Sequence, residues 1–296
     1  LGTLNGASTG VVTLDGTTLT LGGGVFAGVL ANGTSAGSLV KVSGETLSLS
    51  GVNTYTGTTL VNAGTLTLGG SLASASLTVG TLGTLNVLAS GLVPVGSLVE
   101  LAGGLNLFNS AVTLGTLNGI SSGLVTLDGT TLTLGGGVFG GTLANGAATG
   151  SLLKVSGETL SLSGVSTYTG TTRIRPGIDL IAADDAAFGQ SSVALEGGRL
   201  SLVSGVTLAN PLTLSSGTLA GEGTVSTATA LSVGTGINLQ PGFELVGTFN
   251  FVAPTTSDVA LSLMGGGAYR WKVGDATVSG GEWDRIAVNG AVSIGA

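Results

Sequence analysis

Apolar and polar residues alternate with a period of two through most of this 296-residue chain. Because successive side chains of a β-strand point to opposite faces, each alternating segment predicts a strand with one buried leucine face and one Thr, Ser or Asn face. No segment carries a long apolar stripe of helical period, so we expect very little helix. The leucine pairs that define these strands are Leu19/Leu21, Leu47/Leu49, Leu66/Leu68, Leu105/Leu107, Leu200/Leu202, Leu212/Leu214 and Leu261/Leu263.

Short glycine-containing segments separate the predicted strands, which are three to six residues long. Gly-Gly, Asp-Gly and Asn-Gly pairs recur in them and supply the positive φ angles that tight corners require. Asp15-Gly16 and Asp128-Gly129 are such pairs. We therefore interpret Asp15 and Asp128 as hairpin or corner residues and not as catalytic acids.

A long internal repeat indicates the fold class. Residues 1–59 recur at 114–172 without a gap, and about five positions in six are identical. Ungapped repeats of this length are typical of arrays that bury their core by stacking one unit on the next. In a sandwich or a barrel each strand has neighbours that no other strand has. Such a fold gives no reason for a sequence to repeat itself after 113 residues. The prediction is therefore all-β, a right-handed parallel β-helix (β-solenoid), in which coils of about 20 residues rise by about 4.8 Å each.

The repeat divides the chain into three predicted zones. Residues 1–113 form a first array copy, residues 114–172 repeat its opening block, and residues 173–296 form a divergent C-terminal part of the solenoid, beginning at Arg173-Ile174-Arg175-Pro176. The last zone holds ten of the fifteen acids and both tryptophans, so we expect it to give the final coil a more polar cover. We expect the two copies of the block to be related mainly by a translation along one axis.

The alternation also predicts which side chains are buried. Inward leucines should stack on their equivalents above and below, and outward Thr and Ser should face solvent. The expected buried set is Leu19, Leu21, Leu47, Leu49, Leu132, Leu134, Leu160 and Leu162, and the expected outward set is Thr20, Ser48, Thr133 and Ser161.

Composition narrows the functional classes. The chain is 42% hydrophobic and 8% charged, which excludes a disordered chain, and its 56 glycines follow no three-residue period, which excludes collagen. A net charge of −7 without a basic face argues against nucleic acid. The sequence has no run of about 18 apolar residues, so it predicts no membrane-spanning helix. Only two bases and five acids precede residue 173, so this part of the chain is close to uncharged. Nearly neutral surfaces associate readily, which favours self-association or adhesion.

Few residues are candidates for chemistry. The chain lacks His and Cys, which excludes His-dependent triads, cysteine nucleophiles and imidazole metal sites. Lys41 with Glu45, and their copies Lys154 with Glu158, predict exposed ion pairs or a stacked ladder.

Two acidic clusters and four aromatic residues complete the candidates. The clusters suit either a glycosidase pair or Ca²⁺, although the Gly-Gly-x-Gly-x-Asp pattern of Ca²⁺-binding β-helices is missing. We interpret the aromatics as packed residues at corners or in a capping coil, with sugar stacking as the alternative. No catalytic, cofactor-binding or metal-ligating residue is predicted. The clusters are Asp184-Asp185 and Asp275, Glu282, Asp284 and Arg285, and the aromatics are Tyr55, Tyr168, Trp271 and Trp283.

One segment carries a family resemblance. From Leu47 to Gly69, an apolar strand is followed by Tyr55-Thr56-Gly57-Thr58-Thr59 and then by Ala63-Gly64-Thr65-Leu66, which resembles the passenger-associated transport repeat of autotransporters. Residues 160–178 keep the Tyr-Thr-Gly turn but read Arg-Pro-Gly-Ile where the first copy has Asn-Ala-Gly-Thr, and the segments 182–189 and 269–286 are also similar to parts of such proteins. The resemblance implies a β-helix exported as a passenger by a type V route.

These observations predict a non-enzymatic extracellular repeat segment of a bacterial surface or secreted protein, acting as a rigid stalk, adhesin or assembly module. The alternative is a self-assembling fibre or sheath subunit, and the third reading is a polysaccharide-degrading β-helix enzyme. We expect self-association or a surface or glycan partner, and no cofactor. The chain reads as a fragment, so we expect its outer-membrane association to come from regions outside it.

Overall fold

The computed structural model describes residues 2–155, 157–177, 179–226, 228–242, 248–253, 259–269, 285–289 and 291–294. The chain divides into two compact units, Leu1–Ser151 and Leu152–Ala296, and parallel strands stack as a β-solenoid in both. Strands account for 58% of the structure, and the described ranges contain no helix. The prediction of an all-β solenoid is confirmed.

The first unit consists of short strands joined by tight corners. Its strands are β1 (Val11–Thr13), β2 (Thr18–Leu21), β3 (Gly24–Phe26), β4 (Val29–Ala31), β5 (Ser38–Lys41), β6 (Thr46–Leu49), β7 (Val52–Asn53), β8 (Thr59–Leu68), β9 (Ser71–Leu72), β10 (Ser76–Val87), β11 (Leu98–Leu101), β12 (Gly104–Leu107), β13 (Ala111–Gly119), β14 (Leu124–Thr126), β15 (Thr131–Phe139) and β16 (Thr142–Ala144).

The remaining strands begin at the boundary between the units. They are β17 (Ser151–Lys154), β18 (Leu160–Leu162), β19 (Thr171–Ile174), β20 (Asp179–Ala182), β21 (Ser192–Leu202), β22 (Thr207–Leu208), β23 (Leu212–Gly221), β24 (Thr224–Ser226), β25 (Leu231–Val233), β26 (Ile237–Pro241), β27 (Thr248–Val252), β28 (Val259–Leu263), β29 (Ala268–Tyr269), β30 (Arg285–Asn289) and β31 (Ala291–Ile294).

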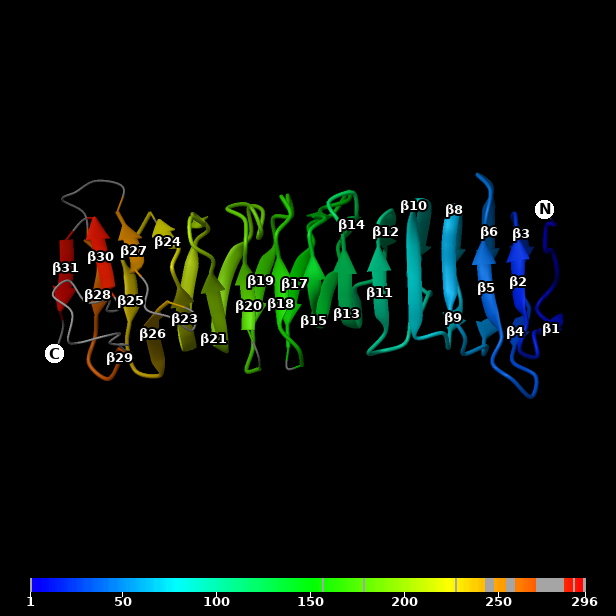
Figure 1. The fold of residues 1–296 in the computed structure, drawn as a ribbon, viewed down its shortest axis with the longest axis horizontal. Helices are drawn as coiled ribbons and strands as arrows, with labels where there is room; N and C mark the ends of the chain where they lie inside the picture. Colours follow the sequence, from blue (N-terminus) through cyan, green and yellow to red (C-terminus); the bar gives the residue numbers. More distant parts are fainter. Residues whose placement is uncertain are drawn as a thin grey trace, which may run out of the picture. The chain divides into compact units, whose positions relative to one another are not determined.

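Parallel pairing stacks the strands of successive coils into columns in the first unit (Figure 1). The β2 column continues through β5, the first halves of β8 and β10, β11 and the second half of β13. The β3 column continues through β6, the second halves of β8 and β10, β12, β14 and β16. Partners lie about 20 residues apart, one coil. One inward row of the β2 column consists of Leu19, Leu39, Thr59, Leu77, Val99 and Leu117.

Six strands are longer than the sequence pattern predicted. β8, β10, β13, β15, β21 and β23 have 10, 12, 9, 9, 11 and 10 residues. Each passes a corner without interruption: β8 pairs with β5 before Gly64 and with β6 after it. Gly64 has a φ of 69°, which lets the chain change direction while both halves keep their partners. The expectation of three to six residues is wrong for these strands.

The predicted burial holds for most leucines. Leu21, Leu47, Leu49 and their copies are at most 5% exposed, whereas Thr20 is exposed and Ser48 half-buried, as are Thr133 and Ser161. Leu19 is only half-buried, because β2 is the first strand of its column and pairs only with β5. Half-burial also applies to Leu212, Leu214 and Leu263.

The repeated block changes its face between the two copies, as the first unit shows for residues 1–38 and 114–151. The copy of β1 is β14, which stacks in the β3 column, whereas β1 itself pairs with β4. The copy of β3 is the end of β15. There Phe139 is the register partner of Gly119 in β13, which belongs to the β2 column. A shift of 113 residues therefore spans about five and two-thirds coils of about 20 residues. The expectation of a simple translation is wrong, and the copies are related by a screw.

The second unit builds its core by the same stacking. β18, β20, the end of β21, the end of β23, β26 and β29 form one column, and β22, β24, β27 and β30 form another. The first column places Leu180, Leu200, Leu219 and Leu239 in register, and each is at most 1% exposed.

Candidate functional site

A buried tyrosine closes the corner before β8. The side chain of Tyr55 has no exposed surface, and its hydroxyl lies 2.7 Å from Oγ1 of Thr59. Thr59 takes an inward position between Leu39 and Leu77, so each buried hydroxyl of the pair has the other as its hydrogen-bond partner. Burial raises the pKa of Tyr55. The interpretation of Tyr55 as a packed corner residue is confirmed, and its ring is not open to a sugar.

The second copy of this corner has the same arrangement. The hydroxyl of Tyr168 lies 2.5 Å from Oγ1 of Thr172, which in turn lies 2.7 Å from Oγ of Ser191. All three side chains are fully buried. Burial raises the pKa of Tyr168 to about 12. The Tyr-Thr-Gly turn is thus a structural device in both copies.

Lys41 is buried, which corrects the prediction of an exposed ion pair. It stands in register with Leu21 and Val61 in the β2 column and has no exposed surface. Its Nζ donates hydrogen bonds of 2.9, 2.9 and 3.0 Å to the carbonyl oxygens of Val42, Ser43 and Ala63. The aliphatic stem thus fills a core position while the ammonium bonds corner carbonyls.

The charges around the two lysines agree with this placement. Burial lowers the pKa of Lys41, and the charge of Glu45 acts in the opposite direction. Lys154 is also fully buried and donates to the carbonyl oxygen of Val155. The ion pairs of the described residues include Arg173–Glu196 at 3.0 Å and Arg199–Asp179 at 3.5 Å.

Asp15 and Asp128 link successive coils at their corners. Asp15 and Gly16 both have positive φ angles, 38° and 76°. The Asp15 carboxylate accepts hydrogen bonds from the N and Oγ1 of Thr34, both at 2.7 Å, and these bonds hold its pKa below its ordinary value. Oδ1 of Asp128 accepts one from N of Ala148 at 2.6 Å. Both are corner residues, as predicted, and not hairpin residues, since the strands pair in parallel.

The two carboxylates of the Asp184-Asp185 cluster accept hydrogen bonds from different backbone groups. Oδ1 of Asp184 accepts a hydrogen bond from N of Ala186, and Oδ1 of Asp185 accepts one from N of Thr207 in the next coil. Of the second cluster only Arg285 is described, an exposed residue at the start of β30. Outside the described residues lie Asp275, Glu282, Asp284, Trp271 and Trp283.

The described ranges contain no group of three or more acidic side chains placed to hold a metal ion. They also contain no helix with the length and hydrophobicity to cross a membrane.

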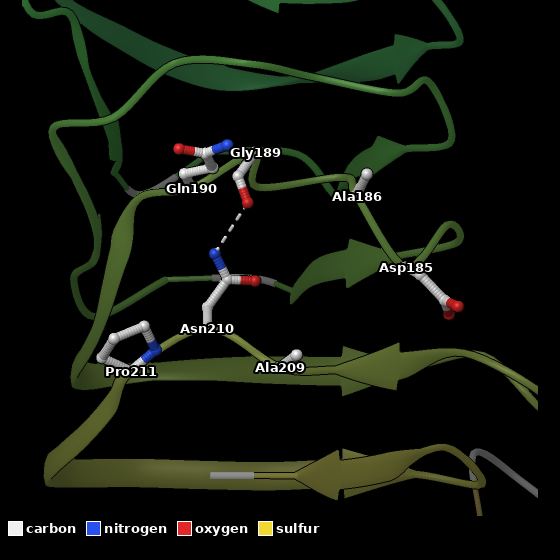
Figure 2. Close-up of a pocket in the computed structure, with 7 residues that line it drawn as sticks. All are labelled: Asp185, Ala186, Gly189, Gln190, Ala209, Asn210 and Pro211. Carbon is white, nitrogen blue, oxygen red and sulfur yellow. Dashed lines mark hydrogen bonds between the residues drawn. The ribbon is translucent and has the colours of Figure 1, made fainter. Parts of the chain in front are cut away.

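A surface pocket of about 420 Å³ lies beside the Asp184-Asp185 turn in the second unit. Figure 2 shows Gln190, Asn210 and Pro211 on one side of it and Ala186 and Asp185 on the other. The sequence analysis missed this pocket. The Asn-Pro pair at 210–211 marks a turn, but nothing local indicates that this turn stacks under Gly189.

Comparison with known proteins finds one family model, and it matches the two segments that contain the tyrosine corners. The family model described as passenger-associated-transport-repeat matches residues 39–68 and 152–178, together about a fifth of the chain. Two segments of the chain are therefore similar to the passenger-associated-transport repeat. No curated protein and no solved structure matches the chain. The first repeat runs from β5 through the end of β8 and therefore includes both the buried Lys41 and the Tyr55–Thr59 pair.

Proposed function

We propose that this chain is a non-enzymatic segment of a bacterial surface or secreted protein, in which the solenoid serves as a rigid stalk. The two passenger-associated-transport repeats carry the proposal, because each forms coils of the solenoid itself and uses its signature tyrosine inside the core. Repeats of this name belong to exported passengers, which supports an extracellular or cell-surface location.

The mechanism is mechanical. Within each unit, parallel strand pairing links successive coils through backbone hydrogen bonds, so stiffness comes from the backbone and not from any one side chain. Outward ladders add cross-coil bonds, such as that from Nδ2 of Asn106 to Oδ1 of Asn86 at 2.9 Å. The carboxylates of Asp15, Asp184 and Asp185 are engaged with backbone N–H groups, which favours a structural role for them.

Surface labelling tests the proposed location. Antibodies raised against the purified chain should label intact source cells, and brief protease treatment of those cells should remove the signal while a cytoplasmic marker persists. Labelling that requires permeabilised cells contradicts the proposal.

A fibre-forming role is the second candidate, and one observation favours it. Eight of the exposed large apolar side chains lie within residues 82–124, and Glu100 is the only charged residue between Glu45 and Asp128. Neutral surfaces with exposed apolar groups associate readily. Sedimentation velocity over a range of concentrations separates the two roles. A stalk stays monomeric, whereas a fibre subunit forms growing species that Val95→Lys, at a side chain 81% exposed, should suppress.

An enzymatic role is tested by screening the purified chain against neutral and acidic polysaccharides. We expect no turnover, because the carboxylates of Asp15, Asp128, Asp184 and Asp185 accept hydrogen bonds from backbone N–H groups. Turnover that is lost in Asp284→Asn and retained in Asp15→Asn would replace the stalk with a polysaccharide-degrading enzyme.

A further inference from the structure

The pocket beside Asp185 contains a fixed hydrogen-bond acceptor. Asn210 is only 6% exposed, and its Nδ2 donates to the carbonyl oxygens of Gly189 at 3.0 Å and Ser191 at 2.8 Å. These two bonds fix the amide plane, so the position of Oδ1 is fixed as well. Both of these hydrogen bonds use Nδ2, so they leave Oδ1 as the acceptor of the amide, and Asn210 is among the residues that line the pocket.

The orientation of this acceptor matters for ligand binding. Figure 2 shows the amide oxygen of Asn210 turned away from Gly189 and Gln190, toward the side of the pocket where Ala209 and Asp185 lie. An acceptor that is held in one position at a pocket wall can accept a hydrogen bond from solvent or from a ligand without first being ordered. The acceptor is therefore suited to a donor that enters the pocket.

The other walls define the chemistry of that donor. Gln190 is exposed and contributes an amide that both donates and accepts. Ala186, Ala209 and Pro211 add apolar surface, and Asp185 adds a negative charge at the edge, with its carboxylate pointing away from the other labelled residues (Figure 2). Amides beside small apolar surfaces suit a molecule with several hydroxyl groups and a C–H face, and the negative edge disfavours an acidic one.

We propose that this pocket binds one ring of a neutral sugar, with a ring hydroxyl donating to Oδ1 of Asn210 and a second bonding the Gln190 amide. The cavity of about 420 Å³ falls within the usual range of small-molecule sites, about 300–1,000 Å³. The site goes beyond the stalk role and does not depend on it, since a free or a polymer-bound sugar presents the same ring.

Ligand-observed saturation-transfer NMR on the full chain tests the proposal, followed by titration of any sugar that binds. The probes are glucose, N-acetylglucosamine, a β-linked glucose tetramer and glucuronate. At least one neutral probe should bind, and glucuronate should bind more weakly than glucose. Tighter binding of the tetramer than of glucose identifies a polymer as the source, and equal binding identifies the free sugar.

Two variants place the binding at this pocket. Ala209→Trp fills the cavity from an exposed position and should weaken binding at least about tenfold, whereas Gln190→Ala should weaken it about two- to tenfold, the value of one neutral hydrogen bond. The matched controls are Ala147→Trp, also exposed, and Asp128→Asn, and both should bind as the unaltered chain does. Melting curves verify that each variant folds.

Three outcomes overturn the site: no neutral sugar binds, glucuronate binds as well as glucose, or binding is unchanged in both Ala209→Trp and Gln190→Ala. Surface labelling of cells is unaffected by any of them, so failure of the sugar site is distinguishable from failure of the stalk role.

Discussion

The hydroxyl of Tyr55 and Oγ1 of Thr59 lie 2.7 Å apart inside the solenoid, only four residues apart in the chain. Tyr168 and Thr172 form the same pair in the second passenger-associated-transport repeat. Each pair brings two hydroxyl groups into an apolar column and leaves both of them hydrogen-bonded. The conspicuous tyrosine of the repeat is thus a fixed part of the corner and not a contact for a partner.

Removing one hydroxyl of this pair should cost more than removing both. Tyr55→Phe leaves the buried Oγ1 of Thr59 without its partner, and we expect a loss of about 1–3 kcal/mol in the free energy of unfolding. The double variant Tyr55→Phe/Thr59→Val should recover part of that loss. Urea unfolding of the two single variants and the double variant completes the cycle. Strictly additive losses would contradict a direct interaction.

High pH should destabilise the fold through Tyr168. The folded-state pKa is raised to about 12 from the ordinary value of 10, so between these values the native state keeps a proton that the unfolded state has lost. Stability should therefore fall as pH rises, by up to about 1.4 kcal/mol per pH unit for each such proton. Tyr168→Phe should reduce the slope by about one proton. An unchanged slope would show that Tyr168 ionises freely in the folded chain.

Damage to one coil should stay local. Leu49 is fully buried, and Leu49→Ala should cost about 2–5 kcal/mol. Because each coil contacts only its neighbours, hydrogen exchange should accelerate in β6 and the paired end of β8 and remain unchanged in β12 and β14. Leu82→Ala, at a side chain 76% exposed, is the control and should change stability by less than about 0.5 kcal/mol. Acceleration throughout the chain would argue for one cooperative unit.

A disulfide can verify the screw relation between the repeated blocks. Asn106 and Thr126 are register partners in β12 and β14, in a chain without cysteine. Adjacent strands place such Cα atoms within the range that a disulfide spans. Asn106→Cys/Thr126→Cys should therefore crosslink on mild oxidation. Asn106→Cys/Thr133→Cys is the comparison, because Thr133 pairs with Thr113 instead. Crosslinking only in the comparison pair would contradict the screw.

The leucine pairs, the corners and the passenger-associated-transport repeat could be predicted from the sequence because each depends on neighbouring residues. Period-two alternation fixes which side of a strand is apolar wherever that strand lies, and Asp15-Gly16 forms a turn whatever it stacks against. The predicted burial of Leu47 and Leu49 is therefore correct. Leu19 departs from its pattern only because it lacks a coil on one side.

Tertiary structure alone decided the features that depend on which coil lies above which. Lys41 reads as half of an exposed ion pair until stacking places it between Leu21 and Val61 and brings the carbonyl of Ala63 to its Nζ. The pocket at Asn210 exists because this turn stacks under Gly189. The repeated block returns on another face because the shift of 113 residues between its copies is not a whole number of coils. A local pattern states what each segment prefers, whereas the length of every coil, added along the chain, determines which residues meet.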